Sequence, residues 1–309
     1  MMKNRKIRKV IRSKPTIEGA GVHLHRAFGN SEVPQFDPFL LLDDFRSDEP
    51  RHFLNGFPWH PHRGIETITY VLAGDVEHSD SMGNNGVIGP DDVQWMTAGS
   101  GIIHQEMPKG DSKGRMYGFQ LWANLPASHK MMDPRYRGIL AEEIPSVAVD
   151  GGAIIKVIAG EVNGTIGSVQ DIITDPEYLD VTIPPHSEFT HPTVSGHTVF
   201  AYIIEGNGLF CKEKDPFSYE VEGINYFDMK QDPFIGNATL VLFDDGDQVS
   251  VSTEKEPVRF LLISGKPINE PVAWYGPIVM NTQEELQRAF EEFNSNTFIK
   301  RSLNKNLEI

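Results

Sequence analysis

The chain has 309 residues, of which 39% are hydrophobic and 10% aromatic, and it carries a formal net charge of −15. This composition is typical of a globular protein with one large or two ordinary domains, and it excludes a mostly disordered or fibrous chain. The acidic balance argues against a broad nucleic-acid-binding surface, because like charges repel the phosphate backbone.

The N-terminal segment is a basic exception, with seven lysines and arginines among its first fourteen residues. Such a cluster is found in localisation tags and nucleic-acid arms, but the alternation over Lys6–Arg12 favours an edge strand guarded by charge. Neither a secretion signal nor an apolar run of the ~20 residues that cross a bilayer is present. The single cysteine, Cys211, excludes an intrachain disulfide. We therefore expect a cytoplasmic protein, or also a nuclear one in a eukaryote, that binds neither membranes nor nucleic acid directly.

Short β-branched and aromatic runs, separated by many of the 28 glycines and 21 prolines, predict a mostly β structure. In the first half the expected strands are Phe39–Phe45, Ile65–Val71, Val93–Met96, Ile102–Glu106 and Met116–Ala123. The polar, irregular stretch from Pro126 to Pro145 then indicates the end of a first domain.

The strand pattern restarts in the second half. The expected strands are Ala153–Ala159, Leu179–Ile183, Val199–Ile204, Leu240–Asp244, Gln248–Val251 and Val258–Ser264. An internal repeat supports two similar domains, because Thr69–Gly74 and Ala201–Gly206 both read as a strand that ends in a glycine turn. We predict domains at residues 1–140 and 141–309.

One helix is predicted at about residues 282–293. Thr282 and Glu285 form a capping box. The apolar residues that follow at helical spacing are Leu286, Ala289, Phe290 and Phe293. The apolar face of this helix is expected to pack back on the β core.

Two groups of polar side chains have the spacing of metal ligands. His60 and His62 stand two apart, with Glu66 four residues further on, and in an extended chain all three share one face. His104 and Glu106 repeat the same alternation after a glycine-rich turn. Two such groups on facing strands can direct three imidazoles and a carboxylate to one metal ion and leave coordination positions open.

The alternative is that these histidines are held by hydrogen bonds inside the fold. His23 and His25 also have the His-x-His pattern, but no suitable second pair follows them that is not already used. We interpret those two as ordinary strand residues.

Three longer strings resemble the signatures of the pirin family: Asp37–Phe45 (DPFLLLDDF), Pro61–Thr67 (PHRGIET) and Gln94–Met107 (QWMTAGSGIIHQEM). The resemblance runs from about Ile11 to Phe293 and is looser in the second half. It implies an all-β bicupin, two tandem cupin (jelly-roll) β-barrels with a closing C-terminal helix.

The resemblance also implies one divalent metal ion in the first domain, usually Fe2+, with His60, His62, His104 and Glu106 as its ligands. Mn, Co, Ni, Cu and Zn suit the same ligand types. Glu66 is then a catalytic candidate that orients a histidine or polarises a water, or else a buried, paired carboxylate.

The second domain offers no equivalent ligands when Gly206 is aligned with Gly74. The positions equivalent to His60, His62 and Glu66 are Pro192, Val194 and Thr198, none of which is a good ligand. We therefore expect one metal ion per chain.

The resemblance implies a quercetin 2,3-dioxygenase, which converts a flavonol and dioxygen into a depside and carbon monoxide. The alternative is a metal- or redox-sensing regulator that binds a transcription factor or an enzyme without physiological catalysis. Sugar-phosphate isomerisation fits the strings less well. No feature demands a dimer, so a monomer is expected.

Some residues near the predicted ligands have two readings. The aromatic side chains Phe57, Trp59, Trp95 and Trp122 could line a pocket or belong to the core. Arg63 could steer an anionic substrate or form a surface ion pair.

Overall fold

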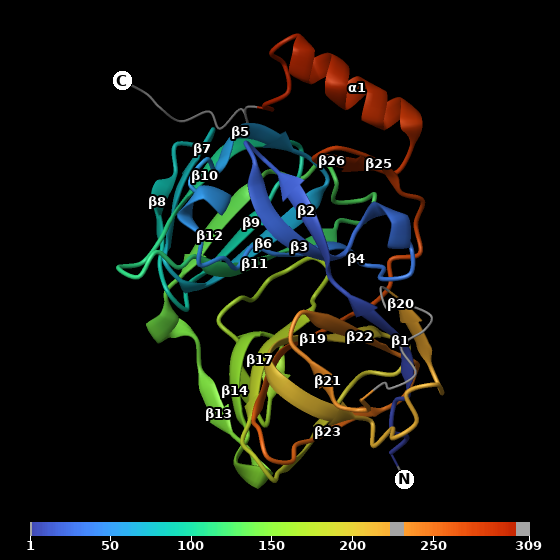
Figure 1. Ribbon diagram of the computed structural model, residues 1–309. Coiled ribbons are helices and arrows are strands. Elements are labelled where there is room, and N and C mark those ends of the chain that lie inside the picture. Colours follow the sequence, from blue (N-terminus) through green and yellow to red (C-terminus); the bar gives the residue numbers. More distant parts are fainter. Residues whose placement is uncertain (1, 223–231, 301–309) are drawn as a thin grey trace.

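The computed structural model describes residues 2–222 and 232–300. Two sets of β-sheets are stacked one above the other, with the N-terminal set at the top of Figure 1. Strands dominate the regular structure of these residues, and one α-helix, α1 (Gln283–Asn294), follows near the C-terminal end. The prediction of a nearly all-β chain with a closing helix is confirmed.

The first unit consists of two facing sheets. The larger one has, in hydrogen-bonding order, β12 (Arg135–Ile139), β9 (Val93–Thr97), β6 (Ile65–Ala73), β11 (Tyr117–Asn124), β4 (Phe39–Asp44), β3 (Val22–Phe28) and β2 (Lys14–Glu18). The smaller one has β5 (Phe57–His62), β10 (Ile102–Lys109), β7 (Asp75–Asp80) and β8 (Asn85–Ile88).

The second unit is built on one branched sheet. Its main order is β13 (Ser146–Ala148), β14 (Ile154–Ala159), β17 (Glu177–Ile183), β24 (Val258–Gly265), β19 (Thr198–Phe210), β22 (Thr239–Phe243), β1 (Ile7–Arg12) and β20 (Glu220–Glu222). Its branch strands are β18 (Glu188–Pro192), β21 (Ile235–Gly236) and β23 (Gln248–Ser252). In the described part of the chain, no strand pairing closes either unit into a continuous ring.

Short elements complete the fold. Two hairpins pair β15 (Glu161–Val162) with β16 (Thr165–Ile166) and β25 (Ala273–Tyr275) with β26 (Ile278–Met280). Single-turn 3-10 helices lie at Asn30–Glu32, Pro50–His52, Ala141–Glu143 and Asp150–Gly152.

Both ends of the described chain cross to the other unit. The basic N-terminal segment forms β1, which pairs with β22 and β20 of the second unit, so the prediction of a strand is confirmed and that of an edge strand is wrong. Arg5 and Lys9 are buried there, because partners from the second unit surround them.

At the other end, α1 lies over the first unit (Figure 1). The boundary between residues 140 and 141 stays a prediction.

The strands expected from the apolar runs are all present, with ends that differ by a few residues. Gly74 and Gly206 both have positive φ, at 78° and 68°, as the repeat requires of a glycine turn. The second copy differs in that β19 continues past Gly206 to Phe210, with a register shift between Ile203 and Glu205. The repeat is therefore real, but its second strand is longer.

Two large clusters form the core. One is made of residues from both units, including Phe39, Trp95, Phe119, Phe200 and Leu261, and lies between the sheets of the two units. The other fills the second unit. Burial of this shared cluster holds the two units together, since each buried large side chain contributes roughly 1.5–3 kcal/mol.

The closing helix begins as the sequence predicts. The Thr282 hydroxyl accepts a hydrogen bond from the Glu285 backbone amide, and the Glu285 carboxylate accepts one from the Thr282 backbone amide. Leu286 and Ala289 pack on Ile278 of the preceding hairpin, so this part of the apolar face is buried as predicted. Phe293, at the end of the same face, is 37% exposed. No described helix has the length and apolar character needed to span a membrane.

Candidate metal centre

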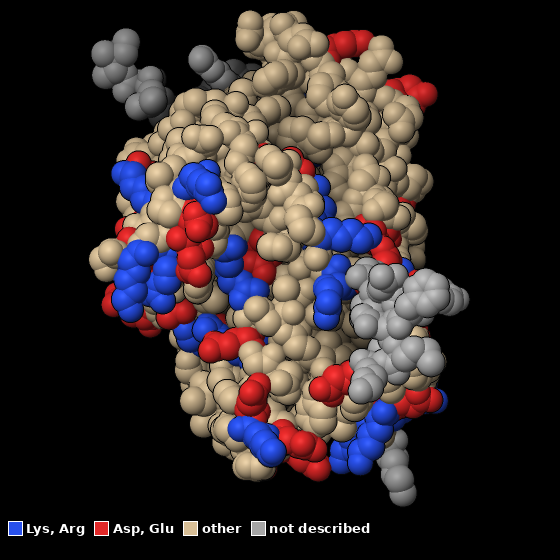
Figure 2. Space-filling view, viewed as in Figure 1, with Lys and Arg blue, Asp and Glu red and all other residues tan. Residues whose placement is uncertain are grey.

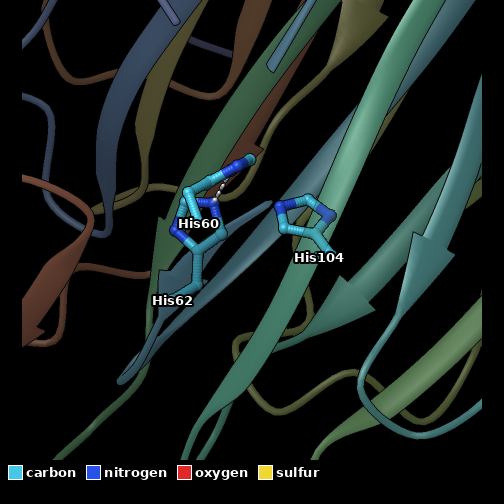
Figure 3. A group of neighbouring side chains, drawn as sticks. All are labelled: His60, His62 and His104. Atoms are coloured by element: carbon cyan, nitrogen blue, oxygen red, sulfur yellow. Dashed lines mark hydrogen bonds between the residues drawn. The ribbon is translucent and has the colours of Figure 1, made fainter. Parts of the chain in front are cut away.

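Three histidines converge inside the first unit. His60 and His62 lie on the same face of β5, because side chains alternate along a strand, and His104 lies opposite His60 on β10. One ring nitrogen from each lies within 4.8 Å of the others. Figure 3 shows the three imidazoles turned toward one another from these two strands. The structure thus brings together the three predicted histidine ligands.

The hydrogen bonds of His60 and His62 determine which nitrogens are free. His60 Nδ1 lies 2.9 Å from the Pro58 carbonyl oxygen, and His62 Nδ1 lies 3.1 Å from that of Pro277. A carbonyl oxygen only accepts, so each Nδ1 carries the proton. The two Nε2 atoms lie 3.1 Å apart, within hydrogen-bonding distance (dashed line, Figure 3). If both rings are neutral with the proton on Nδ1, however, neither Nε2 has a hydrogen to donate, and the two lone pairs face each other. A cation between them would turn this repulsion into coordination.

Burial favours the neutral form of two of the three rings, His62 and His104. Burial, together with the neighbouring imidazoles, lowers the pKa of His62 and of His104 well below the usual value of 6.5. Both nitrogens of His104 lack a hydrogen-bond partner among the described residues, although the side chain is fully buried. Neutral, buried imidazoles with free nitrogens are the donors that a divalent transition metal requires, so the residues fit such an ion.

Glu106 lies beside the histidines but outside their tight group. It lines the same cavity as His60 and His62. Its two oxygens accept hydrogen bonds from the Thr69 hydroxyl and the Gln120 amide, each at 3.0 Å. Both bonds hold the carboxylate in a fixed orientation and leave lone pairs free for a further partner.

Glu66 is not brought to the cluster. The chain turns at Gly64, where φ is +78°, so Glu66 lies on β6 and not on the strand of the histidines. The expectation of one shared face is wrong for this reason. Glu66 accepts a hydrogen bond from Thr97 at 2.7 Å, and alternation places it on the face of β6 opposite to Thr69. Burial raises its pKa. Glu66 is therefore a buried carboxyl group held by one hydrogen bond, without an ion pair among the described residues, and its catalytic role stays a prediction.

A cavity of about 390 Å³ opens beside the histidines. Phe57 and Trp122 line it, as does Trp274, which comes from the far end of the chain. Trp95 belongs to the core, and Trp59 is 53% exposed. Of the four aromatic candidates, two face the cavity and two do not.

Charged residues form another part of the cavity lining. Arg26 makes two hydrogen bonds to Asp43, at 2.8 and 2.7 Å, and an ion pair with Glu18 at 2.9 Å. Burial raises the pKa of Asp43, and the contact with Arg26 opposes that rise. The cavity is therefore aromatic in one part and hydrogen-bonding in another.

His78 is a further histidine near the cluster that was not among the predicted site residues. This residue on β7 is buried, its ring stacks on Tyr136 at 4.8 Å, and its centroid lies 5.6 Å from that of His104. Its Nε2 lies 3.5 Å from the Asp80 carboxylate, a long contact, and Nδ1 has no hydrogen-bond partner in the described ranges. The available signal was alternation, because β7 buries Val76, His78 and Asp80 in turn. In the second unit, His191 is bound by Glu177 at 2.8 Å.

Models of known families match both units of this chain. The model described as pirin matches residues 21–123, and that described as the pirin C-terminal cupin domain matches residues 178–299. The chain belongs to the pirin family.

Similar proteins support this membership along the whole chain. A pirin-like protein of Caulobacter vibrioides is 41% identical over 95% of this chain and 99% of its own length. Human pirin is 38% identical over 96% of this chain and 94% of its own length. A crystal structure of quercetin 2,3-dioxygenase from Acinetobacter baumannii aligns with a TM-score of 0.81 at 30% identity, covering 96% of this chain and 98% of that one. The pirin resemblance and the double-cupin fold are thereby confirmed.

Proposed function

We propose that this pirin-family chain is a metal-dependent dioxygenase that cleaves quercetin or a similar flavonol with dioxygen. The observation that carries the proposal is the pair of facing Nε2 atoms of His60 and His62, which calls for a cation at the wall of a partly aromatic cavity. The similarity to the Acinetobacter protein supports the choice of reaction.

In this proposal His60, His62, His104 and Glu106 hold one metal ion, and we take it to be Fe2+. Imidazole and carboxylate ligands also suit Mn, Co, Ni, Cu and Zn, so the choice of iron rests on the family resemblance. When bound, the ion supplies a Lewis acid that binds the flavonol hydroxyl oxygen and lowers the pKa of that hydroxyl. Glu106 lies outside the tight group of three histidines, so its carboxylate has to turn toward them to become a ligand.

The side chains of the cavity position and deprotonate the flavonol. Glu106 accepts the hydroxyl proton, because its oxygens face the cavity and are oriented by Thr69 and Gln120. The indoles of Trp122 and Trp274, with centroids 5.9 Å apart, offer apolar surface to the flavonol rings. Both oxygen atoms of dioxygen enter the depside, and one carbon of the flavonol leaves as carbon monoxide.

The first test is quercetin-dependent oxygen uptake by the iron-reconstituted protein. We expect uptake that is lost in His62→Ala, because this variant removes one of the three converging nitrogens. His25→Ala is a matched control, since His25 is exposed on β3 and points away from the cavity; it should retain the wild-type rate. Equal uptake in His62→Ala and wild type would sink the proposal.

A different outcome of this test would favour the second candidate function, a metal- or redox-sensing regulatory protein. Bound metal without quercetin-dependent uptake would leave a metal- or redox-sensing binding protein as the better function. Acidic and basic side chains are interspersed on the face shown in Figure 2. The net charge of −15 opposes contact with nucleic acid, so we expect such a role to act through a protein partner. In either case we propose a cytoplasmic monomer.

A further inference from the structure

The last part of the described chain returns from the second unit to the metal centre. We call residues 272–300 the C-terminal strap; it contains β25, β26 and α1. In Figure 1 the strap leaves the second unit and ends above the first, beside β5. It is therefore placed to contact the strand that carries His60 and His62.

The strap contacts His62 and the residues that follow it. The Pro277 carbonyl accepts the Nδ1 hydrogen of His62, which fixes both the tautomer and the ring direction. The next bond lies in the backbone, where the Val279 amide donates to the Arg63 carbonyl at 3.1 Å. The backbone of Gly64 approaches so closely that an added Cβ would lie 1.9 Å from the Val279 carbonyl oxygen. The two segments are thus packed backbone against backbone.

Lys130 joins the same two segments from the other side. Its side chain is 1% exposed, and its ammonium group donates to the carbonyl oxygens of Gly64 at 2.9 Å and Val279 at 3.1 Å. The Asn124 side chain accepts a third bond at 2.6 Å. Its acceptors among the described residues are all uncharged, which makes a buried lysine costly, so these contacts indicate a specific role at this junction.

Arg63 attaches the histidine segment to the helix. Its guanidinium is buried and lies 2.8 Å from Glu292 on α1. It also donates to the Phe298 carbonyl at 2.9 Å and stacks on the ring of Phe298 at 4.2 Å. The arginine end of this ion pair is buried, and Glu292, which also pairs with Lys300 at 2.8 Å, is 21% exposed. The expectation of a surface pair is therefore wrong for Arg63, and its contacts leave it no freedom to steer a substrate.

We propose that the C-terminal strap is the positioning element of the metal centre, with Arg63, Glu292 and Lys130 as positioning residues that hold His62 in its binding orientation. None of the three is placed to touch the metal or the substrate. The inference rests on the metal site of the proposed function but not on flavonol cleavage. It follows that the second domain supports the metal centre through this strap.

The test compares metal retention in Glu292→Gln and Glu291→Gln. Both variants change the same residue type on α1. Among the described residues the Glu291 side chain accepts one hydrogen bond, from Gln287, whereas the Glu292 side chain pairs with Arg63. The proteins are loaded with Co2+, and the transfer of Co2+ to an excess of chelator is followed by the visible cobalt spectrum. Glu292→Gln should release Co2+ about tenfold faster than wild type, as supporting residues of metal ligands typically do when changed. Glu291→Gln should keep the wild-type rate and spectrum.

Lys130→Met provides a second, independent variant, with the exposed Lys113→Met as its control. It should also release Co2+ about tenfold faster and shift the cobalt bands, since the Gly64 and Val279 carbonyls lose their shared donor. Equal release rates for all variants and wild type would overturn the positioning role and leave the metal site intact. Failure of the wild-type protein to bind Co2+ would overturn both. Absence of quercetin cleavage with normal Co2+ binding would overturn the dioxygenase alone, because the release rates would still decide the role of the strap.

Discussion

The individual histidines of the metal centre are arranged at a cost to the metal-free protein. His62 and His104 are buried as neutral rings, and the nitrogens of His104 have no partner among the described residues. An unsatisfied buried polar group costs about 1–3 kcal/mol, and the facing lone pairs of His60 and His62 add repulsion. A bound cation removes these costs, so metal binding should stabilise the fold as well as supply chemistry.

The same burial predicts a pH dependence for the metal-free protein. The folded-state pKa values of His62 and His104 lie below the unfolded value of about 6.5, so the unfolded chain binds more protons in acid. Their contribution to stability is present above that pH and is lost as the pH falls toward the folded-state values. Two such groups give a slope of up to about 2.7 kcal/mol per pH unit.

Urea unfolding of metal-free protein between pH 7.5 and 5 measures this slope. The double variant His62→Gln/His104→Gln should show a shallower decline in acid, because neither glutamine takes up a proton. Parallel curves for wild type and the double variant would contradict this account of the histidines.

At the scale of elements, the sequence predicted those strands and helix ends that depend on neighbouring residues. Apolar runs between turn residues predicted the central strands, and the capping box predicted where α1 begins. Alternation placed His60 and His62 on one face. The same rule failed for Glu66, because the chain turns at Gly64 and a new strand begins after it. A single glycine in the sequence does not show by itself that the strand is interrupted there.

The rest of the site depends on contacts that are distant in sequence. Trp274 lines the cavity and Pro277 bonds to His62, although more than two hundred residues separate His62 from Pro277. No spacing rule connects residues so far apart. The buried side chain of Lys130 likewise gave no signal, because its acceptors are mainly backbone carbonyls that every sequence supplies.

The cap of α1 gives a prediction for this element. Thr282→Ala removes the hydroxyl that accepts from the Glu285 amide and should lower the free energy of unfolding by about 1 kcal/mol. Faster amide hydrogen exchange should appear first in the initial turn of α1. Gln283→Ala, at the exposed neighbouring position, should leave both quantities unchanged. Slower exchange or unchanged stability in Thr282→Ala would show that the cap does not hold the helix.

At the scale of the whole molecule, the internal repeat reappears in the way the two units are joined. Tyr70 and Tyr202 occupy the same position before Gly74 and Gly206, and each reaches into the opposite unit. The Tyr70 hydroxyl donates to Asp180 at 2.7 Å, and the Tyr202 hydroxyl donates to Asp44 at 2.8 Å.

Both of these carboxylates are also bound by an arginine of their own unit. Asp180 is bound by Arg259, and Asp44 by Arg46. Burial and the adjacent carboxylate raise the pKa of both tyrosines, Tyr70 and Tyr202, well above 10, so each remains a donor across the physiological range. Two equivalent tyrosines, one from each unit, therefore make the same kind of hydrogen bond across the interface.

These two bonds predict how strongly the units are coupled. Tyr70→Phe and Tyr202→Phe each remove one hydrogen bond to a charged group and should lower the free energy of unfolding by about 2 kcal/mol. The arginine partners remain, so neither carboxylate is left alone. Tyr178→Phe is a matched control, since Tyr178 is buried beside Tyr70 but its hydroxyl has no partner among the described residues.

Chemical denaturation followed by tryptophan fluorescence and by circular dichroism measures these effects. Tyr178→Phe should be neutral or slightly stabilising, because it removes an unsatisfied buried hydroxyl. The two probes should report one shared transition in wild type, since the core cluster between the units is contiguous, and the transitions should begin to separate in the Tyr70→Phe/Tyr202→Phe double variant. If the double variant were as stable as Tyr178→Phe, apolar burial alone would couple the two domains, and the duplicated tyrosine would be a relic of the repeat without a role in stability.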